Sequence, residues 1–471
     1  MKDIKEIYGG AATYKSTSTN TLLNFLELPM ESKNWLITKF SDENGSIDAF
    51  ALSEYIKKMR LKTNDWNIKL LEARHSPKGQ IKLLTKIVIE FDYAEDLICF
   101  RLPEYGFPTK RKEAQADWSI ISENKEYLLK SEGAWGEITL DYNCGIIQLA
   151  DFKPLCPYTY DLNSYREKRK NFTTEEWIDV LLAGLNFNGK NMTREEKLTL
   201  LQRFLPFVEK RLNTIELAIK GSAKSYCYSQ LSSYNWLVGG GSVSRATAFF
   251  NNTTKKPGYF SKHSQVIFDE VQTIRCQAPE EMCGALKTYL ESGEIRIGNY
   301  SGVADAGLSL IGNVPIGSMD VKKSNMLKFL PNWLKESALI DRFTFLIEGK
   351  KIGRFTEDRK MEGWALSTDY LTGILHQLRD EFYYRAIIDE LLYVDGKCDV
   401  RNFEAVKKNA TAFLKLLFPH ITNIKEINIK DFKEYCLKPA IEGRENILSQ
   451  LRIIDEEYIN VKMPIIKVKG E

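Results

Sequence analysis

The chain has 471 residues, 43% of them hydrophobic, which is enough to build sizeable buried cores in roughly two to four domains. Its 66 basic and 63 acidic residues leave a net charge of +3, which excludes nucleic-acid binding through overall charge and requires any such site to be local. The N-terminus has no apolar signal core and no apolar run approaches about 18 residues, so we expect a cytoplasmic protein without membrane contact.

The cysteines are scattered, and none forms a C-x-x-C pair or stands at zinc-finger spacing from a histidine. This pattern predicts reduced thiols and argues against a zinc site. The eight residues are Cys99, Cys144, Cys156, Cys227, Cys276, Cys283, Cys398 and Cys436.

The N-terminal region has the pattern of an α/β domain. We expect a helix at residues 48–59 and two β-hairpins, one within residues 81–102 and one within residues 135–149. Residues 10–16 resemble a phosphate-binding loop in their letters, but no apolar strand precedes them, so we expect an ordinary loop there. The basic cluster at residues 110–112 is either a solvated loop or a nucleic-acid contact.

Two capping boxes, Thr173 with Glu176 and Thr193 with Glu196, predict helices that lead into an apolar strand at residues 214–218. A turn follows this strand, and Lys224 then opens a helix-like segment. This order of strand, loop, Lys-Ser and helix is the P-loop layout, in which backbone N–H groups and a helix N-terminus hold phosphates. The predicted phosphate contacts are Gly221, Ser222, Ala223, Lys224 and Ser225.

The loop departs from the pattern G-x-x-x-x-G-K-[ST], which requires glycine where Ala218 and Ala223 stand. An alanine forced into a conformation that favours glycine costs about 1 kcal/mol or more. Lys224 and Ser225 are intact, so the sequence predicts nucleotide binding more firmly than nucleotide turnover.

A second apolar run, residues 266–268, ends at Asp269 and Glu270. A buried strand that stops at two adjacent carboxylates is a Walker B layout. One carboxylate can hold Mg²⁺ and the other can orient or deprotonate an attacking water.

Lys255, Lys256, Tyr259 and Phe260 combine cations with aromatic rings around a turn. In a ring-shaped ATPase such a loop could face a central pore and touch a polymer. The other interpretation is an ordinary loop with a buried aromatic.

Residues 294–300 alternate in polarity around Arg296 and predict one arm of a hairpin, with a second strand at residues 308–311. Asn313, at the tip of that second strand, could sense a γ-phosphate or position water, or could be a turn residue. Arg342 lies between two apolar runs and is costly to bury unpaired. It either pairs with Asp341 or another acid, or acts as an arginine finger in trans.

Residues 351–471 are mostly helical and predict a small bundle, with helices at residues 370–384, 402–418 and 429–451. Pro439 should break or kink the last of them. Arg444 on that helix could reach a phosphate or remain solvated.

Several segments together resemble the BrxL family, the Lon-like AAA+ proteins of BREX phage-defence systems. The match spans most of the chain. The segments are GAWGEITLDY (133–142), FTTEEWIDVLL (172–182), KSYCYSQLSSYNWLVGGG (224–241), FFNNTTKKPG (249–258), VIFDEV (266–271), YLESG (289–293), LIGN (310–313) and AVKKNATAFLKLLFP (405–419).

The resemblance implies an α/β fold with three parts. An α/β, DNA-binding N-terminal domain would occupy residues 1–165, and an AAA+ P-loop core, a parallel sheet flanked by helices, residues 166–350. A helical lid with a short tail would occupy residues 351–471. It also implies ATP and Mg²⁺, a homo-oligomeric ring (hexameric or stacked), and action on DNA together with other phage-defence proteins.

For individual residues, the resemblance implies phosphate and Mg²⁺ contacts at Lys224 and Ser225, a Mg²⁺ contact at Asp269, a catalytic base at Glu270 and a sensor at Asn313.

The string ALIDRF resembles the arginine-finger segment of MCM-type helicases, which places Arg342 against a neighbour's nucleotide. Arg444 would be a second sensor. Residues 293–306 would form a hairpin inserted toward DNA.

Many family members continue into a Lon-protease-like domain. No Ser–Lys dyad can be assigned in this chain, so we expect no proteolysis. Two other functions stay open. The alanines at 218 and 223 fit a scaffold that does not hydrolyse ATP, and Tyr259 with Phe260 fits a chaperone that acts on protein.

Overall fold

The computed structural model describes residues 3–16, 28, 30–42, 46–62, 65–76, 79–92, 95–129, 133–143, 145–155, 160–229, 231–232, 234–396 and 398–470. The chain divides into two compact units, Thr13–Thr159 and a larger unit that joins Met1–Ala12 to Tyr160–Glu471. The boundary expected at residue 165 falls inside helix α8 (Leu162–Arg169). The expected core and lid lie together in the larger unit.

The smaller unit contains a closed barrel of five strands in the order β2-β3-β4-β6-β5. Its neighbouring strands are antiparallel except for β4 and β6, which are parallel. Both predicted hairpins form, but the sequence did not predict that the short strand β4 closes them into a barrel. The strands are β2 (Gln80–Asp92), β3 (Leu97–Arg101), β4 (Ala114–Ala116), β5 (Ala134–Asn143) and β6 (Ile146–Pro154).

The barrel interior is filled by one face of each strand. In β5 buried and partly exposed positions alternate, as expected when successive side chains point to opposite faces. Leu83, Phe100 and Leu140 are completely buried in this core. The architecture resembles the OB-fold, a five-stranded barrel. Among its described residues, the α-helices of this unit are α3 (Met30–Phe40), α4 (Ala49–Met59), α5 (Trp66–His75), α6 (Trp118–Glu123) and α7 (Lys125–Leu128).

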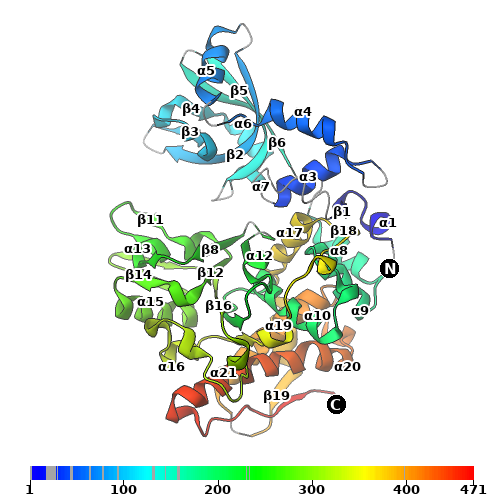
Figure 1. Cartoon of the computed structure of the whole chain (residues 1–471). Helices are drawn as coiled ribbons and strands as arrows, with labels where there is room; N and C mark the ends of the chain where they lie inside the picture. The colour runs from blue at the N-terminus through cyan, green and yellow to red at the C-terminus, as the bar shows by residue number, and fades with distance from the viewer. Residues whose placement is uncertain are drawn as a thin grey trace. The chain divides into compact units, whose positions relative to one another are not determined.

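A parallel sheet of five strands, in the order β17-β7-β16-β12-β8, lies at the centre of the larger unit (Figure 1). All its neighbouring strands run in the same direction. Every residue of β7 and β12 is buried, which is typical of a parallel sheet covered on both faces. The strands are β7 (Thr214–Ala218), β8 (Asn235–Gly239), β12 (Gln265–Asp269), β16 (Gly307–Asn313) and β17 (Phe345–Ile347).

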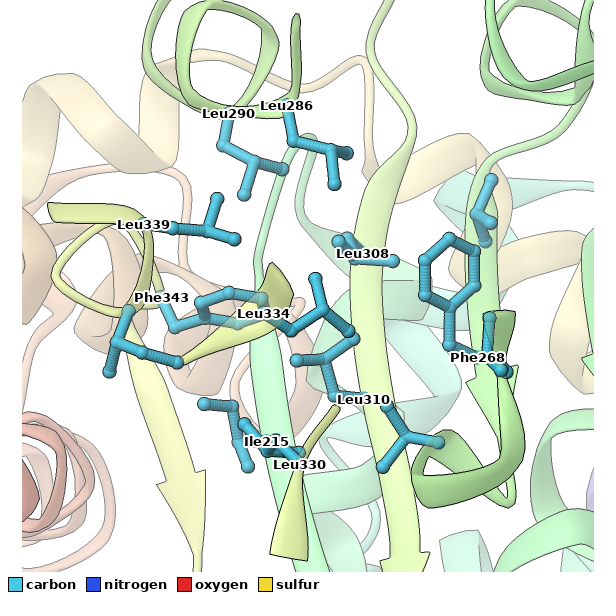
Figure 2. Close-up of a cluster of buried hydrophobic side chains, with 14 of the residues drawn as sticks. Ile215, Phe268, Leu286, Leu290, Leu308, Leu310, Leu330, Leu334, Leu339 and Phe343 are labelled. Carbon is cyan, nitrogen blue, oxygen red and sulfur yellow. The ribbon is translucent and has the colours of Figure 1, made fainter. Parts of the chain in front are cut away.

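One face of the sheet is covered by apolar side chains from helix α15 (Pro279–Ser292) and from the segment that leads to β17. Figure 2 shows Leu286 and Leu290 of α15 together with Leu339 and Phe343, beside Leu308 of β16. These side chains are at most 6% exposed. This dry core holds α15 against the strands whose ends carry the predicted site residues.

Two short hairpins flank the sheet. Helix α15 continues directly into β14 (Glu294–Ile297), which pairs in antiparallel fashion with β15 (Tyr300–Val303). The second strand expected at residues 308–311 is instead part of β16 in the central sheet, because its residues are buried on both faces. The other hairpin pairs β10 (Phe250–Asn251) with β11 (Lys256–Pro257).

The C-terminal helices are α17 (Thr368–Leu378), α18 (Tyr383–Leu391), α19 (Val400–Leu417), α20 (Ile429–Phe432) and α21 (Lys438–Ile454). The single helix expected at residues 370–384 is wrong, since α17 ends before α18 begins. Pro439 lies in the first turn of α21, where its missing N–H costs no helical hydrogen bond. A π-helical turn, Lys433–Leu437, precedes it.

Further helices of the larger unit include α9 (Thr174–Gly184), α10 (Arg194–Leu201), α12 (Lys224–Ser229) and α16 (Ser337–Ile340). Both predicted capping boxes are present at the starts of α9 and α10. Among the helices described, none combines the length and the apolar character needed to cross a bilayer.

Candidate nucleotide site

The carboxyl ends of β7, β16 and β12 lie side by side at one edge of the sheet. Ala218 at the end of β7 is the direct neighbour of Asn313 at the end of β16. β12 pairs with the other side of β16 and ends at Asp269. In open parallel sheets, ligands bind outside the carboxyl ends of the strands. The structure therefore brings the predicted P-loop, sensor and Walker B residues to one edge.

The Lys224 ammonium is buried and uses all three of its donors. It donates to the Ile219 carbonyl at 2.9 Å and to the Ser222 hydroxyl at 3.3 Å. The third hydrogen bond goes to Oδ1 of Asn313 at 3.1 Å. Burial lowers the pKa of Lys224, and the charge of Glu216 opposes this shift. Lys224 and Asn313, predicted separately from two distant segments, thus touch each other.

The two alanines that replace glycines in the loop are not equivalent. Ala223 has a φ of 59°, a left-handed backbone conformation that favours glycine over residues with a side chain. Gly221, with a φ of 77°, has a positive φ as well but is a glycine. Ala218 has no such strain and ends a regular strand. A Cβ added to Gly349 would lie 2.3 Å from the Cβ of Ala218, so the absence of a side chain at Gly349 makes room for this alanine. Of the two alanines, only Ala223 has a backbone conformation that favours glycine.

A buried ion pair beneath the loop was missed by the sequence reasoning. Arg203 and Glu216 are both 0% exposed, with Nη2 of the guanidinium 2.6 Å from Oε1 of the carboxylate. Nη1 of Arg203 donates to the Ser222 carbonyl at 2.8 Å, immediately before Ala223. The charge of Glu216 keeps the pKa of Arg203 above its usual value although burial opposes this. The available signal was Glu216 itself, a charge inside an apolar strand that must be paired.

The two carboxylates of the predicted Walker B pair differ in exposure. Asp269 is 9% exposed and accepts the N–H of Glu270 at 2.7 Å. Glu270 is exposed and has a φ of 47°, a left-handed conformation that is costly for a non-glycine residue and typical of functional sites. This geometry separates a carboxylate held against the sheet from one presented to solvent.

The oxygen donors at this edge fit Mg²⁺. Ser225, at the start of α12, is exposed, and Asp269 has a carboxylate oxygen that does not accept the Glu270 N–H. Mg²⁺ is usually bound by one or two carboxylates together with substrate phosphates. Within the residues described, no cluster of three or more His, Cys, Asp or Glu side chains could hold a metal by itself.

Of the two interpretations of Tyr259 and Phe260, the structure favours the loop with buried aromatic side chains over a polymer contact. The two side chains are 9% and 0% exposed in helix α14 (Tyr259–Lys262), and Phe260 stacks on Phe249 at 5.0 Å between ring centroids. The local sequence shows a turn but not the core into which these rings pack. Lys255 and Lys256, at the β10–β11 hairpin, are exposed. The Arg296 side chain in β14 is 70% exposed and pairs with Glu294 at 2.6 Å.

Arg342 pairs with an acid, but with a different one from its sequence neighbour. Its Nη2 lies 2.5 Å from Oε2 of Glu291, at the end of α15, and its Nη1 donates to the Ala338 carbonyl. Asp341 instead pairs with Arg401 and with Arg444, each at 2.5 Å. The trans role of Arg342 remains a prediction.

Arg444 is completely buried and does not lie in solvent as the simpler interpretation expected. Besides Asp341, it donates to the carbonyl of Phe343 and to Oδ1 of Asn402. Among the residues described, its hydrogen-bond partners are Asp341 and Phe343, on either side of Arg342, and Asn402 of α19. None of them belongs to the predicted P-loop. The structure thus gives Arg444 a bracing role, and a phosphate contact remains a prediction.

The basic cluster of the smaller unit is paired with acids. Arg111 lies 3.6 Å from Glu90 and 3.5 Å from Asp92, and Lys112 lies 3.1 Å from Glu95. This favours the solvated-loop interpretation. Among the cysteines described, all are free thiols, while Cys144 and Cys156 lie outside the described residues.

Comparison with known proteins shows that both units match models of the same family. Residues 147–464 match a family model described as "Lon-like protease BrxL-like, ATPase domain", and residues 6–142 match "BREX system Lon protease-like protein BrxL N-terminal". The chain is 27% identical over 383 residues to the "Lon-like protease BrxL" of Escherichia coli O9:H4 (strain HS), covering 80% of this chain and 53% of that protein. A protein of the same name from Bacillus cereus (strain H3081.97) is 29% identical over 336 residues, covering 69% and 48%. The chain spans about half the length of these relatives.

Proposed function

The chain belongs to the BrxL family, and on this premise we propose that it is an AAA+ ATPase that assembles into rings, engages DNA and acts in phage defence. The observation that carries the proposal is the hydrogen bond between Lys224 and Asn313 at 3.1 Å, beside the strand that ends at Asp269. A cation, an amide and a carboxylate at one edge of a parallel sheet suit a nucleoside triphosphate.

In the proposed reaction, Lys224 binds the phosphates while Ser225 and Asp269 hold Mg²⁺. When bound, Mg²⁺ neutralises negative charge on the phosphates. Glu270 accepts a proton from water as the water oxygen bonds to the γ-phosphorus. The bond from that phosphorus to the bridging oxygen breaks, and the products are ADP and phosphate. Asn313 orients the water, and Arg342 of a neighbouring subunit stabilises the charge on the transferring group.

Two exposed basic elements and one fold resemblance support the DNA role. Lys255 and Lys256 lie at one hairpin, and Arg296 projects from the other. Such exposed cations suit a phosphate backbone. The barrel of the smaller unit resembles the OB-fold, which holds oligonucleotides in many proteins.

A non-hydrolysing scaffold is the second proposal, and the strained φ of Ala223 favours it. The protein-remodelling alternative loses its motivation, because Tyr259 and Phe260 are buried and cannot grip an unfolded chain.

The test is ATP hydrolysis by purified protein with and without double-stranded DNA, beside Lys224→Ala and Glu270→Gln. We expect turnover that DNA stimulates, and a kcat for Glu270→Gln that is lower by roughly 10²–10⁴ because the general base is lost. Nucleotide binding without turnover would instead support the scaffold.

Mixing two inactive variants tests the shared site. A ring that combines Arg342→Ala with Glu270→Gln subunits contains interfaces where an intact Glu270 faces an intact Arg342, so the mixture should recover activity. No recovery from stable mixed rings would exclude the trans role of Arg342.

A further inference from the structure

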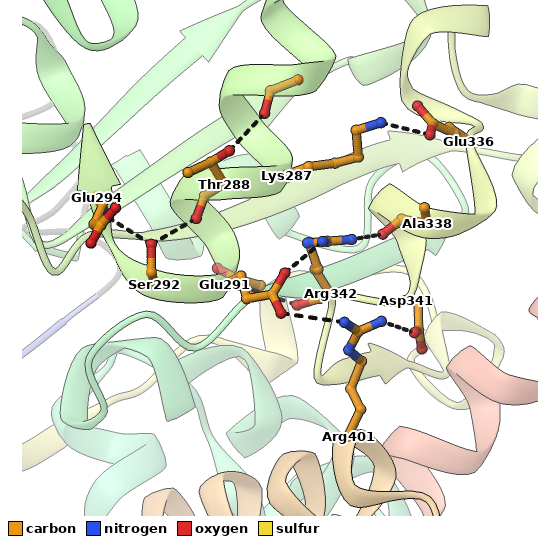
Figure 3. Close-up of polar contacts among 12 residues, drawn as sticks. Lys287, Thr288, Glu291, Ser292, Glu294, Glu336, Ala338, Asp341, Arg342 and Arg401 are labelled. Atoms are coloured by element: carbon orange, nitrogen blue, oxygen red, sulfur yellow. Dashed lines mark hydrogen bonds and ion pairs between the residues drawn. The ribbon is translucent and has the colours of Figure 1, made fainter. Parts of the chain in front are cut away.

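Helix α15 connects the Arg342 segment to the hairpin that carries Arg296. Glu291 lies in the last turn of α15, and β14 begins at Glu294. Oε2 of Glu291 is 2.5 Å from Nη2 of Arg342, while Oε1 is 3.4 Å from Nη2 of Arg401 (Figure 3). A single carboxylate next to the hairpin is therefore shared by two guanidinium groups.

The hairpin is fastened to the end of the helix rather than joined by a loose linker. The Gly293 N–H donates to the Tyr289 carbonyl at 2.7 Å, and the Ala304 N–H donates to the Gly293 carbonyl at 3.0 Å. The Tyr289 hydroxyl donates to the carbonyl of Ala306, which follows the end of β15, at 2.8 Å. Gly293 has a φ of 79°, and a Cβ there would lie 2.7 Å from the Ala304 carbonyl oxygen. Hydrogen bonds thus join the hairpin directly to the helix turn that holds Glu291, and we expect a displacement of one to move the other.

The contacts of Arg342 suit an exchange of its ion-pair partner. The cluster contains three guanidinium groups, those of Arg342, Arg401 and Arg444, but two carboxylates, those of Glu291 and Asp341. One positive charge is thus uncompensated within this group of side chains. The Nε of Arg342 is buried and has no hydrogen-bond partner among the residues described. The Glu291 side chain is 53% exposed, so its carboxylate can pass to Arg401 in water, whereas the Arg342 side chain is 16% exposed and needs another anion once Glu291 leaves.

We propose that Glu291 is a positioning residue for Arg342, which couples engagement of the β14–β15 hairpin by DNA to the placement of Arg342 at a neighbouring subunit's nucleotide. The proposal rests on the proposed function and adds its regulation. When DNA moves the hairpin, the Glu291 carboxylate passes from Arg342 to Arg401, and the released Arg342 turns toward the anionic phosphate of the neighbour.

The test compares Glu291→Gln with a matched control on the same helix. Lys287 lies one turn earlier and forms an ion pair of 2.7 Å with Glu336, so Lys287→Gln removes a comparable α15 contact without touching Arg342. ATP turnover is measured with and without double-stranded DNA. Glu291→Gln should lose the stimulation by DNA, with the ratio of the two rates falling toward one and KM for ATP unchanged. Lys287→Gln should keep both the basal rate and the wild-type ratio.

The outcomes separate this inference from the proposed function. A wild-type protein without turnover, or without a DNA effect, contradicts the proposed function. A stimulated wild type with equal stimulation of Glu291→Gln overturns the coupling through Glu291, and so does loss of stimulation in both variants, since α15 would then need only to be anchored.

If Glu291→Gln does not assemble, Arg401→Gln decides the question. It removes the second partner of the Glu291 carboxylate, and with it one of the two partners of Asp341, but leaves the pair of Glu291 with Arg342 in place, so the ratio of stimulated to basal rate should fall. An unchanged ratio overturns the proposal.

Discussion

The Arg203–Glu216 pair and the cluster of Arg342, Arg401 and Arg444 differ in burial and in charge balance. Beneath the predicted P-loop, one cation pairs with one anion, and both side chains are 0% exposed. In the cluster, guanidinium groups outnumber carboxylates, and side-chain exposure ranges from 1% at Arg444 to 42% at Arg401.

This difference separates two braces, Arg203 with Glu216 and Arg444 with Asp341, from the exchangeable contact of Arg342 with Glu291. A buried pair cannot lose one partner without leaving an uncompensated charge, which is strongly destabilising. A partly exposed pair in water loses little when it opens. We therefore expect Arg203 to keep one position throughout any reaction cycle and Arg342 to change partners.

The largest expected effect is that of Glu216→Gln, which should lower the free energy of unfolding by about 3–5 kcal/mol because Arg203 loses its buried counter-charge. Urea denaturation measures it. The double variant Arg203→Met with Glu216→Leu should lose much less, since neither charge remains. A cost below about 1 kcal/mol for Glu216→Gln would contradict the closed pair.

Asp341→Asn should cost about 2 kcal/mol, because Arg444 is buried and loses a charged partner. Burial alone would raise the pKa of Asp341, but the charge of Arg444 and the hydrogen bonds from Arg401 and Arg444 lower it. A lowered pKa contributes stability that is present above the unfolded value of about 3.9 and is lost at more acid pH.

The difference in unfolding free energy between wild type and Asp341→Asn should therefore be complete at pH 7 and shrink below about pH 4. Denaturation curves at several pH values measure it. A difference that stays constant on acidification would show that the charge of Asp341 does not matter.

Ala223→Gly should raise stability by up to about 1 kcal/mol, because glycine adopts the φ of 59° without strain. Ala218→Gly is the matched control and should lower stability by about 1 kcal/mol, since it removes a buried methyl group from an unstrained strand end. Thermal unfolding of both variants compares them. Equal effects would mean that the positive φ of Ala223 does not strain the loop.

Glu291→Gln should have the smallest effect on stability, at most about 1 kcal/mol, because its carboxylate is half-exposed. The same measurement in high salt should reduce even this difference, since exposed charges are screened. A large, salt-insensitive loss would place Glu291 with the fixed brace and remove the contrast between the two clusters.

In the larger unit, local sequence patterns predicted the helices and strands better than the tertiary contacts between their side chains. The sequence predicted the buried strands β7 and β12 and both capping boxes, because buried strands and helix starts have patterns that depend on neighbouring residues. The pairing of Arg342 with Glu291, 51 positions away, and the support of Ser222 by Arg203 depend on tertiary packing. For the same reason the sequence left the burial of Phe260 as one of two alternatives and did not predict the closure of the barrel by the three residues of β4.

The three hydrogen bonds of Lys224 have a consequence for the timing of the proposed reaction. An ammonium has three donors, and those of Lys224 are all engaged, one of them with Asn313. A phosphate can reach this cation only in exchange for one of these acceptors. If it replaces Asn313, arrival of the nucleotide and release of the Asn313 side chain are one event, so the residue expected to orient water becomes available at the moment there is a phosphate to attack.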